Sequence, residues 1–196
     1  MSIVWKCRVS TSKDDSESTL VERKDRPMTD IAAAPARTRT IEWDDPVAGA
    51  LRGREMSGLE YMRAMIAGEI PRPPIAWSLD FELAEVEEGR AVFTLVPAEF
   101  HYNPIGMVHG GLAATLMDSA MGCAVHSLLP AGVGYTTLEL KVNFLRAMTR
   151  DTGPVRAEGT VLHAGSRTAL AEARLLDAAG KLLAHATSTC MILRPG

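Results

Sequence analysis

The sequence predicts an α+β fold in which a curved antiparallel sheet of about six strands wraps around one long helix. Two segments with strand-like alternation precede a long apolar helical segment, and four more follow it. Turn residues separate the consecutive strands of each group, so neighbouring strands can pair antiparallel. The helical segment is apolar almost all round, which indicates burial on several sides. Together these observations favour a sheet curled around a single helix.

Composition excludes several other classes of protein. The chain has 196 residues, of which 46% are hydrophobic and 23% charged, as in ordinary globular domains. Its net charge of −3 offers no overall basic field for nucleic acid. The three cysteines are odd in number and form no CxxC pair, which favours a reducing compartment and a cytoplasmic location. We expect no membrane segment and no metal site, because no uncharged run suits a span and the histidines lack zinc-like spacing.

The first forty residues differ from the rest of the chain. They hold 8 basic and 6 acidic residues, whereas the remainder has a net charge of −5. Ser10–Ser18 is almost wholly polar, and Ile31–Arg39 is rich in Ala, Pro and Arg without an apolar period. We therefore expect residues 1–40 to be a disordered extension. The alternatives are a start codon assigned too early, with Met28 or Met56 as the true start, and a less favoured transit peptide.

Residues 41–74 are expected to form a helical lead-in and a connector. Apolar residues recur at spacings of three and four between Asp44 and Gly68, which predicts a helix. The proline-rich run 71–74 then imposes an extended connector. Strand-like segments follow at Ile75–Val86 and Ala91–Pro97, and the residues between them suit a hairpin turn. The main domain is expected to span residues 75–194.

The long helix is expected from His109 to Leu128, after which Pro130 ends it. Many of its residues are small, which is typical of a helix that other backbone approaches closely. Four segments with a period of two follow it. In the first, Leu138 is expected on the same face as Leu140 and Val142. The four strands are expected at 137–144, 155–161, 169–175 and 182–192.

The start of this helix carries the most informative polar pattern. Gly110 and Gly111 open it, so its unpaired amide groups and the positive end of its dipole are not shielded by side chains. Such an end can bind a carbonyl oxygen that gains negative charge. Asp118 interrupts the apolar helix two turns later, where a carboxylate is costly unless it is satisfied or used. Each feature alone has an ordinary structural explanation, but their combination suggests a site.

These residues resemble the motif of hotdog-fold acyl-CoA thioesterases of the phenylacetate-degradation type. The resemblance covers about Ile75–Leu193. One departure is Ala147, where a proline often follows in the family. The matching segments are Asn103–Asp118, Thr136–Arg146, His163–Thr168 and Gly180–Ala184.

The resemblance implies roles for five residues in thioester hydrolysis. The Gly110 amide would polarise the thioester carbonyl, while Asn103 and His109 would shape its pocket. Asp118 of a partner subunit would act as general base or attack directly, and Thr137 would position it or the water. An independent argument favours a dimer: Gly110 and Asp118 lie about 12 Å apart along one helix, too far to share one carbon. Two antiparallel helices would bring them together. The family implies a homodimer or homotetramer.

Coenzyme A would enter as part of the substrate, and no other cofactor is expected. Its phosphates need local positive charge, for which we favour Arg146 and Arg167. Backbone in the turn at Gly165 and Ser166 could also accept a phosphate. Gly111 is also expected to contact the coenzyme A part of the substrate. The acyl group, a medium-chain or aromatic one, would enter an apolar slot lined by Met107, Leu112 and Met121.

Two other functions remain open at this point. The first is a hydratase or dehydratase on the same fold, acting on acyl-CoA or acyl-carrier protein. Such sites pair a histidine with an acid, whereas here Asp118 is the only acid of the helix and His109 adjoins the glycine pair. The second is a module that binds acyl-CoA without turning it over. Fold analogy by itself does not decide which reaction occurs.

Overall fold

The computed structural model describes residues 37–195, so the prediction for residues 1–40 lies almost entirely outside the described part. Contacts along the chain separate Thr40–Gly196 as a unit of its own. Its helices are α1 (Pro46–Gly53), α2 (Gly58–Ile66), α3 (Pro74–Leu79) and α4 (Gly110–His126). Its strands are β1 (Phe81–Glu87), β2 (Arg90–Leu95), β3 (Gly134–Phe144), β4 (Val155–Ala164), β5 (Thr168–Asp177) and β6 (Leu182–Leu193).

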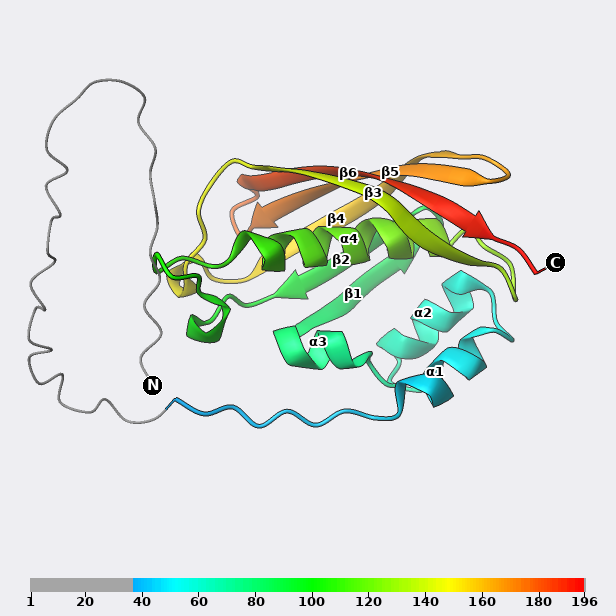
Figure 1. Ribbon diagram of the computed structural model, residues 1–196, viewed down its shortest axis with the longest axis horizontal. Coiled ribbons are helices and arrows are strands. Elements are labelled where there is room, and N and C mark those ends of the chain that lie inside the picture. Colours follow the sequence, from blue (N-terminus) through cyan, green and yellow to red (C-terminus); the bar gives the residue numbers. More distant parts are fainter. Residues whose placement is uncertain (1–36, 196) are drawn as a thin grey trace, which may run out of the picture. The chain divides into compact units, whose positions relative to one another are not determined.

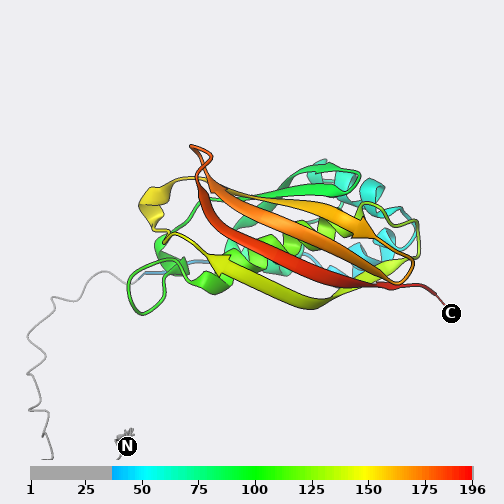
Figure 2. The same ribbon diagram turned by 90° about the horizontal axis from the view of Figure 1, so that it is seen from above.

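The six strands form one antiparallel sheet, as the sequence predicts, and their order in it is β1-β2-β4-β5-β6-β3. In Figure 1, β1 and β2 lie on one side of α4, and β5, β6 and β3 on the other. Figure 2 shows β5 and β6, in orange and red, crossing over the helix. Register shifts interrupt four of the five strand pairs, and such irregularities help a sheet to bend. The wrapped arrangement of helix and sheet is thereby confirmed.

The helix packs against the sheet at very short range. A Cβ at Gly159 on β4 would overlap the backbone of Ala120 on α4, so this position excludes any side chain. Leu112 and Met121 of α4 lie in the core, with exposures of 6% and 0%. The expectation that these two line an acyl slot therefore fails, because the sheet already covers their side of the helix.

The lead-in differs from the prediction in two places. The helix expected from Asp44 to Gly68 is broken into α1 and α2, because Ser57 caps a new helix. The amide of Glu60 donates to the Ser57 hydroxyl oxygen, and the Glu60 carboxylate accepts from the Ser57 amide. The expected strand also begins later, since Pro74–Leu79 is helical. Asp80 ends that helix in the left-handed region, with φ 57°.

Helix α2 docks tightly on the C-terminal end of α4. The Gly58 amide donates to the carbonyl of Leu129 at 3.0 Å, and a Cβ on Gly58 would overlap the carbonyl oxygen of His126. Met62 is fully buried in a small cluster with Ala124. The lead-in is therefore part of the domain's packing on this side.

Candidate active site

The N-terminus of α4 is capped by its own histidine. His109 is the N-cap residue, and its Nδ1 accepts a hydrogen bond from the Gly111 amide at 2.8 Å. Nδ1 therefore carries no proton in this arrangement. A Cβ at Gly111 would lie 2.8 Å from the same nitrogen, so the cap needs glycine there. The Gly111 amide is engaged by His109 and is not directed at a ligand.

The Gly110 amide is differently placed. Among residues 37–195 it donates no hydrogen bond, as is usual for the first amide of a helix. Gly110 lines a pocket of about 330 Å³ at this end of the helix, and the exposed Phe144 ring lies against its Cα. The other lining residues are Asn103, Met107, Val108, Ala113, Leu145, Arg146, Ala147, Met148, Leu175, Leu183 and Ala184.

Asn103 shapes the loop that leads into the helix. Its Oδ1 accepts hydrogen bonds from the amides of Ile105 and Met107, each at 3.1 Å. Gly106 lies within this loop at φ 81°, a conformation that favours glycine. Asn103 thus organises the loop with its carbonyl oxygen and still lines the pocket beside Gly110.

Asp118 is held from the neighbouring strand. The Thr137 hydroxyl of β3 donates to Asp118 Oδ1 at 3.0 Å, and both residues are half-buried. This contact depends on a bulge, because Thr137 pairs with Cys190 and Glu139 with Thr189, leaving Leu138 without a partner. The prediction that Leu138 shares a face with Leu140 is wrong. Leu138 is 55% exposed, and the extra residue turns Thr137 toward the helix.

The groups around Asp118 remain uncharged. Burial and the nearby charge of Asp118 raise the pKa of the Cys123 thiol to about 12, despite a hydrogen bond with Tyr135. The pKa of Tyr135 lies well above its usual value, mainly because the side chain is buried and further because of the neighbouring thiols and Asp118. Cys123 is therefore a protonated thiol at neutral pH and a poor nucleophile. Asp118 is thus the candidate acid–base group of this cluster.

The candidates for coenzyme A contact are not brought together in one subunit. Arg146 lines the pocket beside Gly110, and its guanidinium donates to the Leu182 carbonyl. Arg167 lies at the other end of β6, where its carbonyl accepts from Ile192. Leu183, which pairs with Arg146, and Ile192 are nine positions apart on this strand, or about 30 Å of extended chain. Gly165 and Ser166 share the turn of Arg167, so they too are remote from Gly110.

Two aromatic residues near these groups are absent from the sequence-based site. Phe144 lies on Gly110, and Tyr135 lies so close to α4 that a Cβ at Gly122 would be 2.6 Å from its hydroxyl. In the sequence both sit in a strand with alternating apolar residues, where an aromatic side chain is indistinguishable from core. The small residues on the facing helix could have indicated these two rings, because they leave room for aromatic side chains.

Residues 37–195 contain neither a metal centre nor a membrane-spanning helix. No three His, Cys, Asp or Glu side chains within that range gather as ligands for a metal ion. None of the helices in the same range is both long and apolar enough to cross a membrane.

Comparisons with known proteins place this chain in a family. The thioesterase superfamily profile matches residues 105–184. A Saccharolobus solfataricus protein, named as an esterase by inference, is 37% identical over 59% of this chain and 81% of its own length. A 1,4-dihydroxy-2-naphthoyl-CoA hydrolase from Listeria monocytogenes is 29% identical over 59% of this chain and 92% of its own.

Solved structures similar to this chain indicate the same family. A phenylacetic acid degradation-related protein from Ralstonia eutropha has a TM-score of 0.61 and 30% identity, covering 67% of this chain and 98% of its own. The Escherichia coli PaaI protein, at 23% identity, has a TM-score of 0.60 over 72% of this chain and 96% of its own, and supports the fold. The chain therefore belongs to the thioesterase superfamily, as a thioester hydrolase with the hotdog fold.

Proposed function

We propose that the protein hydrolyses acyl-CoA thioesters in a site shared between two copies of the chain. The observation that carries this proposal is the placement of two groups on α4. The Gly110 amide is available at the helix N-terminus, and Asp118, held by Thr137, faces the half-exposed side of the same helix. These are the oxyanion donor and the base that hydrolysis of a thioester needs.

The two groups must come from different subunits. They are eight positions apart on one helix, which corresponds to about 12 Å. Strand β3 forms one edge of the sheet and is 11 residues long, so a second copy can pair along it. Antiparallel pairing about a two-fold axis would set the two α4 helices side by side in opposite directions. Gly110 of each chain would then approach Asp118 of the other.

The chemical steps follow from this arrangement. The thioester oxygen accepts a hydrogen bond from the Gly110 amide, and the helix dipole stabilises the negative charge that develops there. The Asp118 carboxylate removes a proton from water, and the water oxygen bonds to the carbonyl carbon. When the intermediate collapses, the carbon–sulfur bond breaks and the thiolate takes the proton from Asp118. Thr137 positions Asp118 by occupying Oδ1, and His109 stabilises the helix end through Gly111.

Coenzyme A is the proposed leaving group, as the name of the Listeria relative indicates for that enzyme. Arg146 and Asn103 lie beside Gly110 and would contact the part of the substrate nearest the thioester. The turn of Gly165–Arg167 would reach only a distant part of the molecule. Since water, a base and an oxyanion donor suffice, we propose that the activity survives dialysis against a chelator.

The test is the release of free thiol from a panel of acyl-CoA esters by wild type and Asp118→Asn. This substitution keeps the shape and removes the base, so we expect kcat to fall by at least about 10²-fold. Circular dichroism of the variant controls for folding. A variant within threefold of wild type would overturn the role of Asp118, and a wild type that releases no thiol would overturn the function.

A single-turnover reaction in ¹⁸O-labelled water separates a general base from a nucleophile. With Asp118 as base, the label enters the released acid and Asp118 stays unlabelled. Direct attack would form a mixed anhydride, and water attacking its aspartyl carbonyl would leave label in the Asp118 carboxylate. Mass spectrometry of the peptide that contains Asp118 reads the difference.

A further inference from the structure

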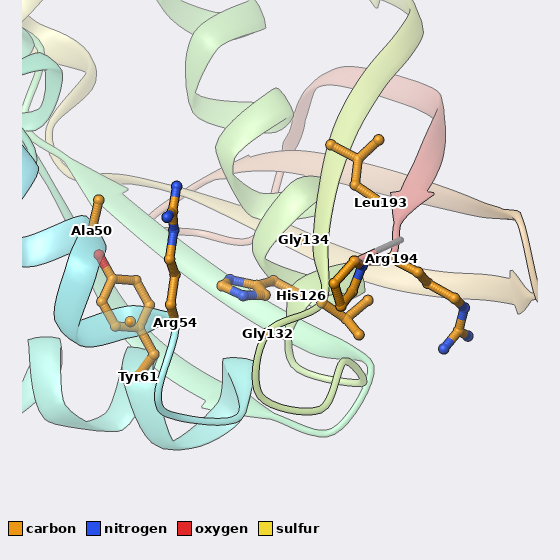
Figure 3. A pocket seen from close by; sticks show the side chains of 11 residues that line it. Ala50, Arg54, Tyr61, His126, Gly132, Gly134, Leu193 and Arg194 are labelled. Atoms are coloured by element: carbon orange, nitrogen blue, oxygen red, sulfur yellow. The ribbon is translucent and has the colours of Figure 1, made fainter.

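A second cavity lies at the opposite end of α4 from Gly110. It has a volume of about 570 Å³ and opens between the lead-in helices and the ends of β3 and β6 (Figure 3). Several of its lining residues lie outside the part of the chain that matches the superfamily profile. The lining residues are Ala50, Gly53, Arg54, Tyr61, His126, Gly132, Val133, Gly134, Leu193, Arg194 and Pro195.

Three polar side chains in this cavity form no hydrogen bond or ion pair within the described part of the chain. Among residues 37–195, Arg54 forms no ion pair, and neither the Tyr61 hydroxyl nor the His126 ring forms a hydrogen bond. In the view of Figure 3 Arg54 extends past Tyr61 and His126, whose rings are in contact, while Arg194 points away from them. Burial lowers the pKa of His126, so its ring is neutral at neutral pH. The cavity thus offers one cation and two neutral polar groups within apolar walls.

A row of neighbouring aromatic rings runs from this cavity to the neighbourhood of Asp118. The Tyr61 and His126 ring centroids are 5.9 Å apart, and those of His126 and Tyr135 are 5.5 Å apart. Tyr135 in turn is hydrogen-bonded to Cys123, and the charge of Asp118 acts on both. Along α4 the distance from Asp118 to His126 is about 12 Å. The helix face between them carries the half-buried Ser119 and Cys123.

We propose that this cavity receives the far end of the acyl group, and that Arg54, Tyr61 and His126 select acyl groups ending in a hydroxyl or carboxylate. The inference rests on the proposed function, because it takes the reacting carbonyl to lie at Asp118. The apolar walls suit a medium-chain or aryl group, and the unpartnered donors suit an oxygen at its end. The Gly58 contact with α4 holds the lead-in side of the cavity in place, so the cavity is preformed.

The test fills the cavity from α1. Ala48 and Ala50 are both exposed on this helix, but only Ala50 lines the cavity. We expect Ala50→Leu to lower kcat/KM for octanoyl-CoA by about tenfold or more through steric overlap, and to leave butyryl-CoA within about twofold. Ala48→Leu is the matched control and should change neither value. An Ala50→Leu variant with the chain-length profile of wild type would overturn the proposal.

Arg54→Ala tests the selection at the far end. For the ω-carboxylated analogue of octanoyl-CoA, loss of a charged hydrogen bond should reduce kcat/KM about tenfold or more relative to octanoyl-CoA. An unchanged ratio would refute the selective role of Arg54. A further comparison uses N-acetylcysteamine thioesters of the same acids, which lack the nucleotide. If Ala50→Leu lowers activity on all CoA esters equally and spares these, the cavity holds the nucleotide end instead.

Binding separates this inference from the proposed function. Octyl-CoA and butyl-CoA thioethers cannot be hydrolysed, so calorimetry measures their affinity even if the protein releases no thiol. Wild type should bind the octyl compound more tightly than the butyl compound, and Ala50→Leu should abolish that difference. Equal affinities in wild type would overturn the inference whatever the hydrolysis assay shows.

Discussion

The two ends of α4 differ in how they are built. The N-terminal end depends on the helix itself and the loop before it: a glycine with an available amide, a histidine cap and a loop organised by Asn103. The C-terminal end is enclosed by segments from elsewhere in the chain, namely α1, α2 and the end of β6. The first lies largely within residues 105–184, which match the superfamily profile, and the second draws on residues outside that range. Under our two proposals, the first end carries the reaction chemistry and the second selects the substrate.

The largest expected effect concerns the amide at the N-terminal end. Gly110→Pro removes this N–H at the first helical position, where proline is favoured. His109 already has φ −63° and ψ 132°, which suits a residue before proline. We expect kcat to fall by about 10²-fold, as for loss of an oxyanion donor. Gly110→Ala adds a side chain but keeps the N–H, and should stay within about tenfold once Phe144 moves aside. Equal losses in both would contradict the role of the amide.

The same variant shows whether the site is shared. When Gly110→Pro and Asp118→Asn chains are mixed equally and reassembled, half of the dimers are heterodimers with one intact site out of two. The mixture should therefore recover roughly a quarter of wild-type activity. No recovery above the sum of the separate variants would place both groups of a site in one subunit.

At the C-terminal end the expected effect is on stability. Gly58→Ala would place a methyl group on the carbonyl oxygen of His126 and push α2 away from α4. We expect a loss of about 2 kcal/mol in the free energy of unfolding, measured by urea denaturation. Gly134→Ala is the control, because a Cβ added there would meet no atom within 4 Å, and it should stay within about 0.5 kcal/mol. A stable Gly58→Ala variant would show that the lead-in is held only loosely.

The smallest expected effect is a pH dependence at the same end. Burial lowers the pKa of His126 in the folded state below its usual 6.5. The unfolded chain therefore binds the proton more readily, and stability falls as pH drops from about 6.5 through the lowered value. In His126→Gln this contribution is absent, so unfolding free energy should depend less on pH between about 7 and about 5. The exposed His163→Gln is the control. Equal slopes in wild type and His126→Gln would contradict the assignment.

The sequence by itself determined the order of the elements and the spacing of the two main candidate site residues. Periodicities of two and near 3.6 are local properties, so they predicted six strands and one buried helix. The glycine pair and Asp118 lie on one helix, so their spacing followed directly from its rise. The same arithmetic indicated that two chains are needed, which remains a prediction.

Only the tertiary structure decided how these parts meet. The bulge at Leu138 reverses the face of Thr137, and nothing in the alternation of β3 reports it, because its cause is pairing with β6. The separation of Arg146 from Arg167 likewise depends on the length of β6, a strand to which neither residue belongs but which both contact. The cavity beside His126 joins residues 50–61 with 193–195. Contacts of such long sequence separation arise from packing, which local patterns do not encode.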